Sequence, residues 1–133
     1  FSTLTLGGKN YKELQNAKPE KYGKLTEEFV LERTRYIGYD IINGKGSTEF
    51  GIGAACADIC KAIFHDEKRV IPASVLLQGE YGIDGVACGV PCVIGRNGIE
   101  DIIELELNDK EKEQMAHTCS VIKEYCERAE KVQ

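Results

Sequence analysis

The 133-residue chain lacks the features that mark several large classes of protein. It has no apolar run near the roughly 20 residues that a membrane-spanning helix needs, so we expect no membrane partner. It has no segment that combines basic, apolar and small residues as a secretory signal does. Its 17 basic and 22 acidic residues are interspersed and give a net charge of −5. This balance disfavours a nucleic-acid surface, so we expect no nucleic-acid partner.

Motifs for nucleotide binding or nucleophilic catalysis are also absent. The sequence has no G-x-G-x-x-G after a strand, no P-loop and no nucleophile elbow. The glycines of Gly89–Gly98 lie in a predicted hairpin, not at the start of a helix. His65 falls at the end of a predicted helix and His117 beside the apolar stripe of another. We expect both histidines to be structural or solvent-facing.

Six cysteines occupy apolar positions in the predicted elements. They are Cys56, Cys60, Cys88, Cys92, Cys119 and Cys126. There is no C-x-x-C knuckle, and neither histidine lies at a zinc-finger distance from a cysteine pair. We therefore expect buried, reduced thiols, as in cytosolic proteins, and no metal. A metal site and disulfides are the two alternatives.

The first quarter of the chain predicts little regular structure. Ser2–Leu6 alternates apolar and polar residues and predicts a short strand. Residues 9–24 are polar and predict a loop with one helical turn at Tyr11–Leu14.

Two helices are predicted next. Thr26 caps the first, which Gly44-Lys45-Gly46 ends. Its predicted inner face consists of Val30, Thr34, Ile37 and Ile41. The second runs over Glu49–Phe64, with an apolar stripe formed by Ile52, Cys56, Ile59, Cys60 and Ile63. Small residues elsewhere on this second helix predict burial between this domain and another body, or a central place in the core.

Three strands and a helix complete the pattern. The strands are predicted at Arg69–Gln78, Val86–Ile94 and Ile99–Leu107, the second covered on both faces. Pro72 predicts an edge position or a bulge in the first strand, and Asn97-Gly98 predicts a hairpin. On the third strand, the predicted inward residues are Ile103, Leu105 and Leu107.

The last helix is predicted to begin at Asn108, with Glu111 as its capping-box partner. Its predicted buried stripe is Met115, Cys119, Ile122 and Cys126. Residues 127–133 are polar and predict a frayed end. Helices and antiparallel strands segregated in this way predict an α+β fold. A chain of this length predicts one domain, residues 1–133.

The entry to the second helix carries the most specific local signal. Glycines at 44 and 46 loosen the turn, and Ser47 or Thr48 can cap the helix with a hydroxyl. A spare hydroxyl at a helix N-terminus, at the positive end of the dipole, can instead meet a carboxylate.

The ordered set of motifs resembles the C-terminal domain of the L-lactate/malate dehydrogenase family, and the bacterial L-lactate dehydrogenases most. The motifs that carry the resemblance are Gly46–Gly53, Asp66–Ser74, Gly79–Gly82, Gly89–Ile99 and Glu104–Asn108. The resemblance implies an antiparallel sheet packed with long helices. It also implies that an N-terminal NAD-binding Rossmann domain lies upstream, with the proton-relay histidine, its aspartate and the catalytic arginines. No catalytic residue is then expected in this chain, which begins at Phe1 within a predicted strand and suggests a fragment.

The same resemblance implies part of a pocket wall. Thr48 matches the position beside the keto-acid group of the substrate, and Ile52 the position that packs against the nicotinamide of NAD. Ile37 and Gly38 match positions that border the variable end of the substrate. Many relatives carry small residues at both, so Ile37 departs from the pattern and is expected to narrow the pocket.

The function that the resemblance implies is the cytoplasmic interconversion of pyruvate and L-lactate with NAD. The implied partners are a small 2-oxo or 2-hydroxy acid and further copies of the subunit in a homotetramer. Thr48 favours lactate-type over malate-type members, but a lactate-like malate dehydrogenase stays open as an alternative. An enzyme with a wider pocket for 2-hydroxycaproate is disfavoured by Ile37. A third alternative is a non-catalytic module that dimerises through its exposed helix.

Overall fold

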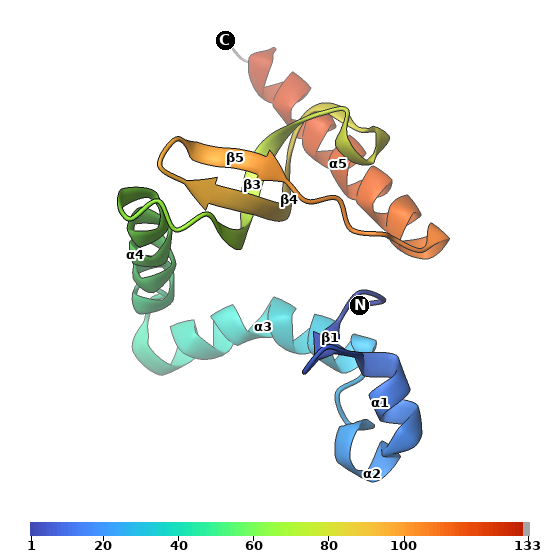
Figure 1. Ribbon diagram of the computed structural model, residues 1–133. Helices are drawn as coiled ribbons and strands as arrows, with labels where there is room; N and C mark the ends of the chain where they lie inside the picture. Colours follow the sequence, from blue (N-terminus) through green and yellow to red (C-terminus); the bar gives the residue numbers. More distant parts are fainter. Residues whose placement is uncertain (132–133) are drawn as a thin grey trace. The chain divides into compact units, whose positions relative to one another are not determined.

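The computed structural model describes residues 1–131, which form two compact units (Figure 1). The first unit is Phe1–Cys56 and the second extends from Ala57 to the C-terminus. The single domain over residues 1–133 stays a prediction.

The first unit begins with a two-stranded hairpin, β1 (Thr5–Leu6) and β2 (Lys9–Asn10). The predicted strand Ser2–Leu6 is shortened because its first residues enter a turn, in which the Leu4 N–H donates to the Phe1 carbonyl at 3.2 Å.

The helical turn predicted at Tyr11–Leu14 is confirmed as part of a longer helix, but the loop predicted for the rest of residues 9–24 was mostly wrong, because a second short helix follows. The two helices are α1 (Tyr11–Ala17) and α2 (Pro19–Tyr22). Asn10 caps α1 by accepting from the Lys12 N–H at 2.9 Å. A proline at the first position of α2 costs no hydrogen bond there. Polar composition concealed these helices because neither has an apolar stripe; α1 has a side-chain cap, and α2 has a proline at its first position.

Tyr11 forms the centre of this unit, with 4% of its surface exposed. The rings of Phe1 and Tyr22 meet it edge-on, with centroids 6.0 and 6.1 Å away. Its hydroxyl donates to the Tyr22 carbonyl at 3.0 Å, so the polar end of the buried ring is satisfied.

α3 (Glu27–Lys45) confirms the first predicted long helix. Thr26 caps it by accepting from the Phe29 N–H at 3.1 Å. Its predicted inner face is only half-buried at Val30, and Ile37 and Ile41 are 48% and 40% exposed. The prediction that these residues form a buried inner face is therefore not confirmed, since no residue of α3 is buried.

α4 (Phe50–Phe64) confirms the second predicted helix to within one residue. Among its described residues only Ala62 is buried, with Ile59 and Ile63 packed partly against the same core. The N-terminal half of the helix is exposed. A central place in the core of this chain is therefore excluded for α4.

The second unit contains an antiparallel sheet in the order β3-β4-β5. Its strands are β3 (Arg69–Gln78), β4 (Asp84–Gly95) and β5 (Gly98–Ile102). The predicted hairpin joins β4 to β5, and Gly98 adopts a φ of +88° that favours glycine. On β4, alternate residues are buried while Ala87 and Gly89 are exposed. The expectation that both faces of this strand are covered was wrong.

Pro72 lies opposite Pro91 in the β3–β4 pair. The Pro91 carbonyl accepts from the Ile103 N–H at 2.8 Å, on the side away from β3. Both backbone polar groups of a residue in an antiparallel strand point the same way, so Pro72 faces the outer edge of β3. The predicted edge position of Pro72 is confirmed, and no ladder bond is lost there.

β5 ends five residues before the predicted strand does. Ile103 and Leu105 are 37% and 38% exposed, so their predicted inward orientation was wrong, whereas Leu107 is half-buried.

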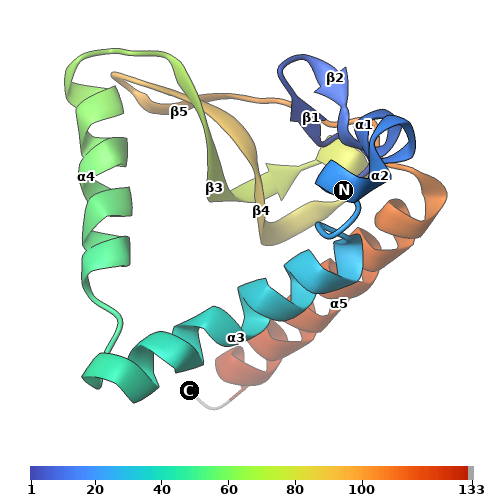
Figure 2. The same ribbon diagram turned by 90° about the horizontal axis from the view of Figure 1, so that it is seen from below.

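α5 (Asp109–Glu130) packs against β4 (Figures 1 and 2). The predicted capping box between Asn108 and Glu111 is present in full. Cys119 is buried and Met115 and Ile122 are half-buried, as predicted, but Cys126 is exposed. The helix continues to Glu130, beyond the predicted frayed start at 127, and residues 132–133 lie outside the described residues.

The core of the second unit consists of Ala62, Leu77, Val90, Cys92 and Ile94. Long helices on antiparallel strands confirm the predicted α+β fold class. None of the helices within residues 1–131 is both long and apolar enough to span a bilayer.

Candidate functional site

Two of the four predicted pocket residues, Thr48 and Ile52, lie where α3 is followed by α4. α3 ends at Gly46, which has a φ of +87° and donates its N–H to the Ile42 carbonyl at 2.7 Å. A left-handed glycine of this kind is the usual way to end a helix and turn the chain. Residues 47–49 then run without regular structure to the start of α4.

Neither hydroxyl of this linker caps α4, contrary to one of the two predicted roles. The Glu49 carbonyl accepts from the Gly53 N–H at 3.0 Å, which places Glu49 itself at the cap position. The Ser47 hydroxyl instead donates to Glu49 Oε1. Cap assignment from sequence failed here because the linker is extended one residue further than expected.

The Thr48 side chain is exposed, and its hydroxyl makes no hydrogen bond within residues 1–131. Glu49 next to it has a carboxylate that would repel an anion. That charge is opposed by Lys45, whose Nζ lies 3.5 Å from Glu49 Oε2. The same ammonium lies 4.4 Å from the centre of the Phe50 ring. A free hydroxyl near a helix N-terminus, with its acidic neighbour paired, can donate a hydrogen bond to a substrate carboxylate or carbonyl.

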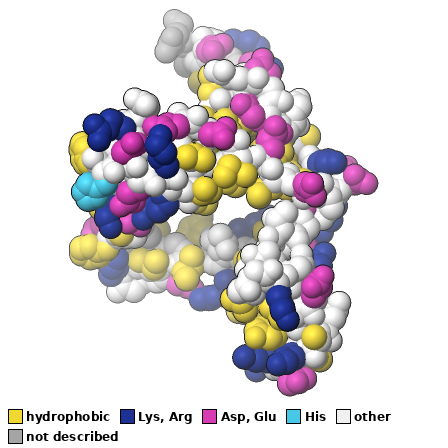
Figure 3. Space-filling model, viewed as in Figure 1, with side chains coloured by type: hydrophobic (Ala, Val, Ile, Leu, Met, Phe, Trp, Pro, Cys, Tyr) yellow, Lys and Arg dark blue, Asp and Glu magenta, His cyan; other side chains and the backbone are white. Residues whose placement is uncertain are grey.

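Ile52 lies in the first turn of α4, one helical turn after Thr48. Its side chain is 69% exposed, and that of Phe50 is 79% exposed. Hydrophobic side chains are visible on the surface of both units (Figure 3).

Ile37 and Gly38 lie in α3, about two turns before its end. Ile37 is exposed and Gly38 is half-buried. A Cβ at Gly38 would meet nothing within 4 Å, so packing within this chain does not require glycine there. Ile37 and Gly38 therefore lie together on α3, whereas Thr48 lies on the linker and Ile52 on α4.

A separate cavity of about 520 Å³ lies within the second unit. The turn η1 (Glu80–Gly82), the segment 104–107 and the beginning of α5 line it, and Lys112 is its one lysine. None of the four predicted pocket residues lines this cavity.

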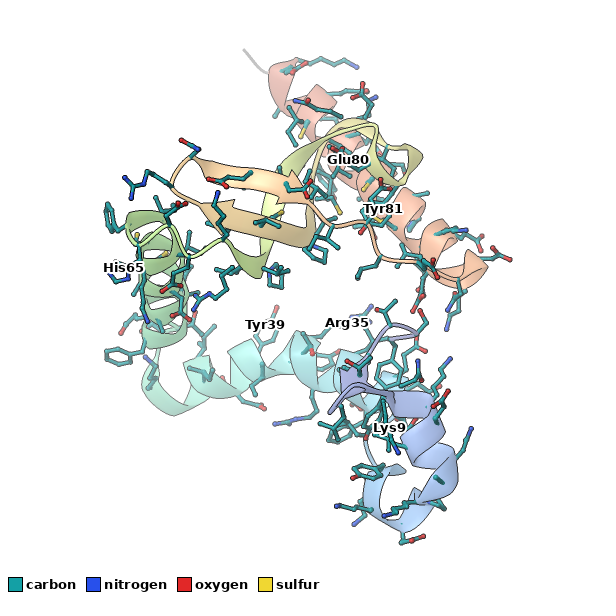
Figure 4. The ribbon with its side chains drawn as sticks, in the orientation of Figure 1. Lys9, Arg35, Tyr39, His65, Glu80 and Tyr81 are labelled. Atoms are coloured by element: carbon teal, nitrogen blue, oxygen red, sulfur yellow. The ribbon has the colours of Figure 1, made fainter. Side chains whose placement is uncertain are left out.

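Tyr81 organises the wall of this cavity (Figure 4). Its hydroxyl donates to the Ile103 carbonyl at 3.2 Å and accepts from the Leu105 N–H at 2.9 Å. Its own N–H donates to Glu104 Oε2 at 2.7 Å. Sequence reasoning assigned a turn here but missed this role. Tyr81 has a φ of +56°, which is rare for a residue other than glycine. The signal in the sequence that could have indicated a special turn is the pair of glycines, Gly79 and Gly82, on either side of Glu80-Tyr81.

Glu80, next to Tyr81, connects the same turn to the end of β3 by a hydrogen bond. Its Oε2 accepts from the Gln78 N–H at 2.6 Å, and this hydrogen bond lowers the pKa of the carboxyl below its usual value.

The prediction for the two histidines is confirmed, whereas the prediction that all six cysteines are buried was wrong. His65 and His117 are exposed, as predicted. Of the six thiols, however, only Cys92 and Cys119 are buried, Cys88 is half-buried, and Cys56, Cys60 and Cys126 are exposed. All six are free thiols. Within the described residues, no group of three or more His, Cys, Asp or Glu side chains is placed to hold a metal ion.

Comparison with known proteins gives a consistent result. Residues 7–133 match the model of the lactate/malate dehydrogenase alpha/beta C-terminal domain. An L-lactate dehydrogenase of Fusobacterium nucleatum is 44% identical over 128 residues, which are 96% of this chain and 40% of that protein.

Two solved structures are similar to this one. A lactate dehydrogenase from a Medee basin deep-sea metagenome library has a TM-score of 0.82 and 31% identity over 92% of this chain and 39% of its own. The malate dehydrogenase from Aeropyrum pernix has a TM-score of 0.75 and 36% identity over 90% of this chain and 38% of its own. The chain thus spans about two fifths of these relatives. It belongs to the lactate/malate dehydrogenase family, as an alpha/beta C-terminal domain.

Proposed function

We propose that this chain is the substrate-binding domain of an NAD-dependent L-lactate dehydrogenase that interconverts pyruvate and L-lactate. The observation that carries the proposal is the 44% identity to an L-lactate dehydrogenase over 96% of the chain. A free Thr48 hydroxyl on the linker before α4 agrees with it. The reaction itself needs groups for proton transfer that this proposal assigns to the part of the intact protein outside residues 1–133.

Within this proposal, Thr48 contacts the carboxylate or carbonyl of the 2-oxo acid. The Lys45 ammonium keeps the neighbouring Glu49 paired, which lowers the repulsion that an incoming anion meets. Ile37 and Gly38 border the variable end of the substrate. A branched side chain at Ile37 restricts that end to a small group, such as the methyl of pyruvate.

The cofactor is the second part of the proposal. An exposed apolar side chain such as Ile52 suits the flat face of a nicotinamide ring, and it excludes water from that face. NADH, when bound, supplies the hydride. The chain has no G-x-G-x-x-G motif for the dinucleotide phosphates, so Ile52 contributes a wall and not the main binding site.

We also propose a cytoplasmic homotetramer for the intact protein. The exposed apolar side chains of α3 and α4 are the surface within residues 1–131 that such contacts would cover. Size-exclusion chromatography with light scattering on the intact protein tests the assembly.

A lactate-like malate dehydrogenase is the second candidate, because the Aeropyrum pernix malate dehydrogenase is 36% identical over 90% of the chain. The deciding experiment measures kcat/KM for pyruvate and for oxaloacetate with NADH, on the intact protein that contains residues 1–133. The expected result is a preference for pyruvate of about tenfold or more, or about 1.4 kcal/mol in transition-state binding. A preference for oxaloacetate would reject the lactate assignment and retain the family.

A non-catalytic module that dimerises is the candidate from a different class. Fluorescence titration of NADH against residues 1–133 alone tests where the dinucleotide site lies, and turnover by the intact protein distinguishes a dehydrogenase domain from the non-catalytic module. The proposal expects no binding at micromolar NADH and no turnover by this part. Micromolar binding would contradict the assignment of the dinucleotide site to the rest of the protein. Absence of turnover in the intact protein, with either 2-oxo acid, would favour the module.

A further inference from the structure

The segment that follows β5 continues that strand in an extended conformation. Residues 103–108 connect β5 to α5 without a turn or a bend. The Tyr81 hydroxyl donates to the Ile103 carbonyl and accepts from the Leu105 N–H. A carbonyl and the N–H two residues later point to the same side in an extended chain. Tyr81 therefore holds this part of the backbone extended from one side.

The other side of the segment offers unused backbone groups. In an extended chain the backbone groups of neighbouring residues point to opposite sides, so those of Glu104 and Glu106 point away from Tyr81. Within residues 1–131, no hydrogen bond is made by the backbone N–H or carbonyl of either glutamate. Both residues are exposed. Unpaired backbone groups at the edge of a sheet are a template for pairing with another chain.

The preceding donor on the same edge is blocked. Ile102 has the same parity as Glu104 and Glu106, so its N–H points to the same side. Asp101 Oδ1 accepts a hydrogen bond from this N–H at 2.9 Å. The open donors from Ile102 to Glu106 are therefore those of the two glutamates, and we call Glu104–Glu106 the docking edge.

An apolar cavity adjoins the docking edge. Residues 104–107 form one wall of the cavity of about 520 Å³, and Met115 and Ala116 form part of another. Leu105, between the two glutamates, is 38% exposed. In strand addition, backbone hydrogen bonds supply affinity and apolar recesses select side chains of the incoming strand. An apolar residue opposite Leu105 is therefore favoured.

Charge determines which strand fits the docking edge. Side chains directly opposite each other in an antiparallel pair lie close together, and like charges there are destabilising. A second copy of this chain, paired through the same edge, would place Glu104 opposite Glu106 twice. Self-pairing is therefore disfavoured. Glu106 forms no ion pair within residues 1–131, so a basic residue opposite it gains an unused partner.

We propose that the docking edge binds an extended peptide segment of another protein with the pattern basic–apolar–basic. The segment adds to the sheet as an antiparallel strand beside β5. Its two basic residues lie opposite Glu104 and Glu106, and its apolar residue lies opposite Leu105. This inference is independent of the dehydrogenase proposal.

Nuclear magnetic resonance on the ¹⁵N-labelled 133-residue chain tests the proposal, because it detects weak binding and locates it. The ligand is the synthetic peptide Thr-Lys-Val-Lys-Thr. Its titration is expected to shift the amide signals of Glu104 and Glu106 more than those of the outer edge of β3. The peptide Thr-Glu-Val-Glu-Thr has the same length and the same branched residues, and it is expected to bind about tenfold or more weakly.

Methylated peptides separate strand pairing from attraction between charges. Methylation of both lysine backbone nitrogens keeps their charge but removes the donors that face the docking edge, so binding is expected to be lost. Methylation of the valine backbone nitrogen is the matched control. That nitrogen points away from the docking edge, so binding is expected to be retained.

Two variants of the chain test the charge requirement. Glu106→Gln is expected to weaken binding of the lysine peptide several-fold. Glu113→Gln is the matched control, because Glu113 is exposed on α5, forms no ion pair within residues 1–131 and removes the same charge. The spectrum of each variant without peptide shows whether it is folded.

Three results would overturn the proposal. One is the absence of any shift at Glu104 and Glu106 with the lysine peptide at millimolar concentration. Another is equal binding by the peptide with methylated lysine nitrogens, which would indicate general attraction to an acidic protein. The third is an equal loss of affinity in Glu106→Gln and Glu113→Gln. The first two use the wild-type chain, so they do not depend on the folding of a variant.

Discussion

Lys68 Nζ donates to Glu100 Oε2 at 2.6 Å and so joins the turn before β3 to β5. A second bond strengthens this link, because Asp66 Oδ1 accepts from the Arg96 N–H at 2.9 Å. Asp66 and Lys68 both have positive φ angles, 53° and 49°. The backbone of this turn is therefore strained, and its side chains form hydrogen bonds that connect it to the β4–β5 hairpin.

The Lys68–Glu100 pair predicts a pH dependence of stability. The hydrogen bond from Lys68 is the largest cause that lowers the pKa of Glu100 below its usual 4.5. The folded chain thus binds this proton less readily than the unfolded chain, so the stabilisation exists above pH 4.5 and disappears as the pH falls below that value. The pKa of Lys68 is raised above 10.5, so its contribution disappears above that pH.

Glu100→Gln is therefore expected to lower the thermal unfolding midpoint at pH 7. In acid, the midpoint of the variant is expected to approach that of the wild type. Thermal unfolding from pH 3 to pH 8 measures this convergence. Glu106→Gln is the matched control, because Glu106 is exposed and forms no ion pair or hydrogen bond within residues 1–131. A difference from wild type that stays constant across this range would contradict the assigned role of Glu100.

Gly95→Ala is expected to destabilise the second unit by about 1–3 kcal/mol through overpacking. A Cβ there would lie 2.6 Å from Glu100 Oε1 and 2.9 Å from Asp66 Oδ1. Both carboxylates already accept hydrogen bonds, so neither is free to move away. Gly89→Ala on the same strand is the control, since its Cβ would meet nothing within 4 Å. Equal urea midpoints for the two variants would refute the steric argument.

Leu77→Ala is expected to cost about 2–5 kcal/mol of unfolding free energy, because Leu77 is fully buried in the core of the second unit. Leu76, the preceding residue on β3, points the other way and is 53% exposed. Leu76→Ala should therefore have a much smaller effect. Chemical denaturation of both variants measures the difference, and a similar loss in each would contradict the assigned core face.

Thr48→Ala in the intact protein is expected to lower kcat/KM for pyruvate by about 1–3 kcal/mol, the worth of one pocket contact. Thr48→Ser, which keeps the hydroxyl, should recover most of this loss. Ser47→Ala is the neighbouring control, because its hydroxyl is directed to Glu49 instead. An unchanged kcat/KM in Thr48→Ala would remove Thr48 from the pocket.

Ile52→Asn is expected to raise the KM for NADH while leaving thermal stability almost unchanged. The side chain is 69% exposed, so little packing within this chain is lost. A polar amide would bring water to the surface that is proposed to meet the nicotinamide. Steady-state kinetics with varied NADH test this effect. If stability falls and the KM for NADH does not change, Ile52 has only a packing role.

The elements whose signals are local were predictable from the sequence. Thr26 and Asn108 cap their helices as predicted, because a cap depends on residues within one turn. The bounds of β3 were also correct, since a run of branched and apolar residues determines them. The helical turn predicted at Tyr11–Leu14 was correct but too short, and α2 was missed, because neither helix has an apolar stripe; α1 depends on the cap at Asn10 and α2 on the position of Pro19.

Features that depend on distant residues were not predictable. Ile103 and Leu105 continue the alternation of β5, yet the strand ends before them because the Tyr81 hydroxyl binds their backbone groups. Cys56 and Cys60 were predicted to be buried from the apolar stripe of their helix, yet both are exposed, because periodicity does not show whether other residues cover a face. The placement of Thr48 and Ile52 came from the family resemblance, and their contacts with ligands stay predictions.

The orientation of Pro72 has a consequence for how this sheet meets other chains. Its ring nitrogen faces the outer edge of β3, where an N–H would otherwise be offered to a visiting strand. A strand from another molecule that approached this edge would find the row of donors interrupted near the middle of β3. The sheet is thereby protected against growth by edge-to-edge addition, the step by which exposed strands begin to aggregate.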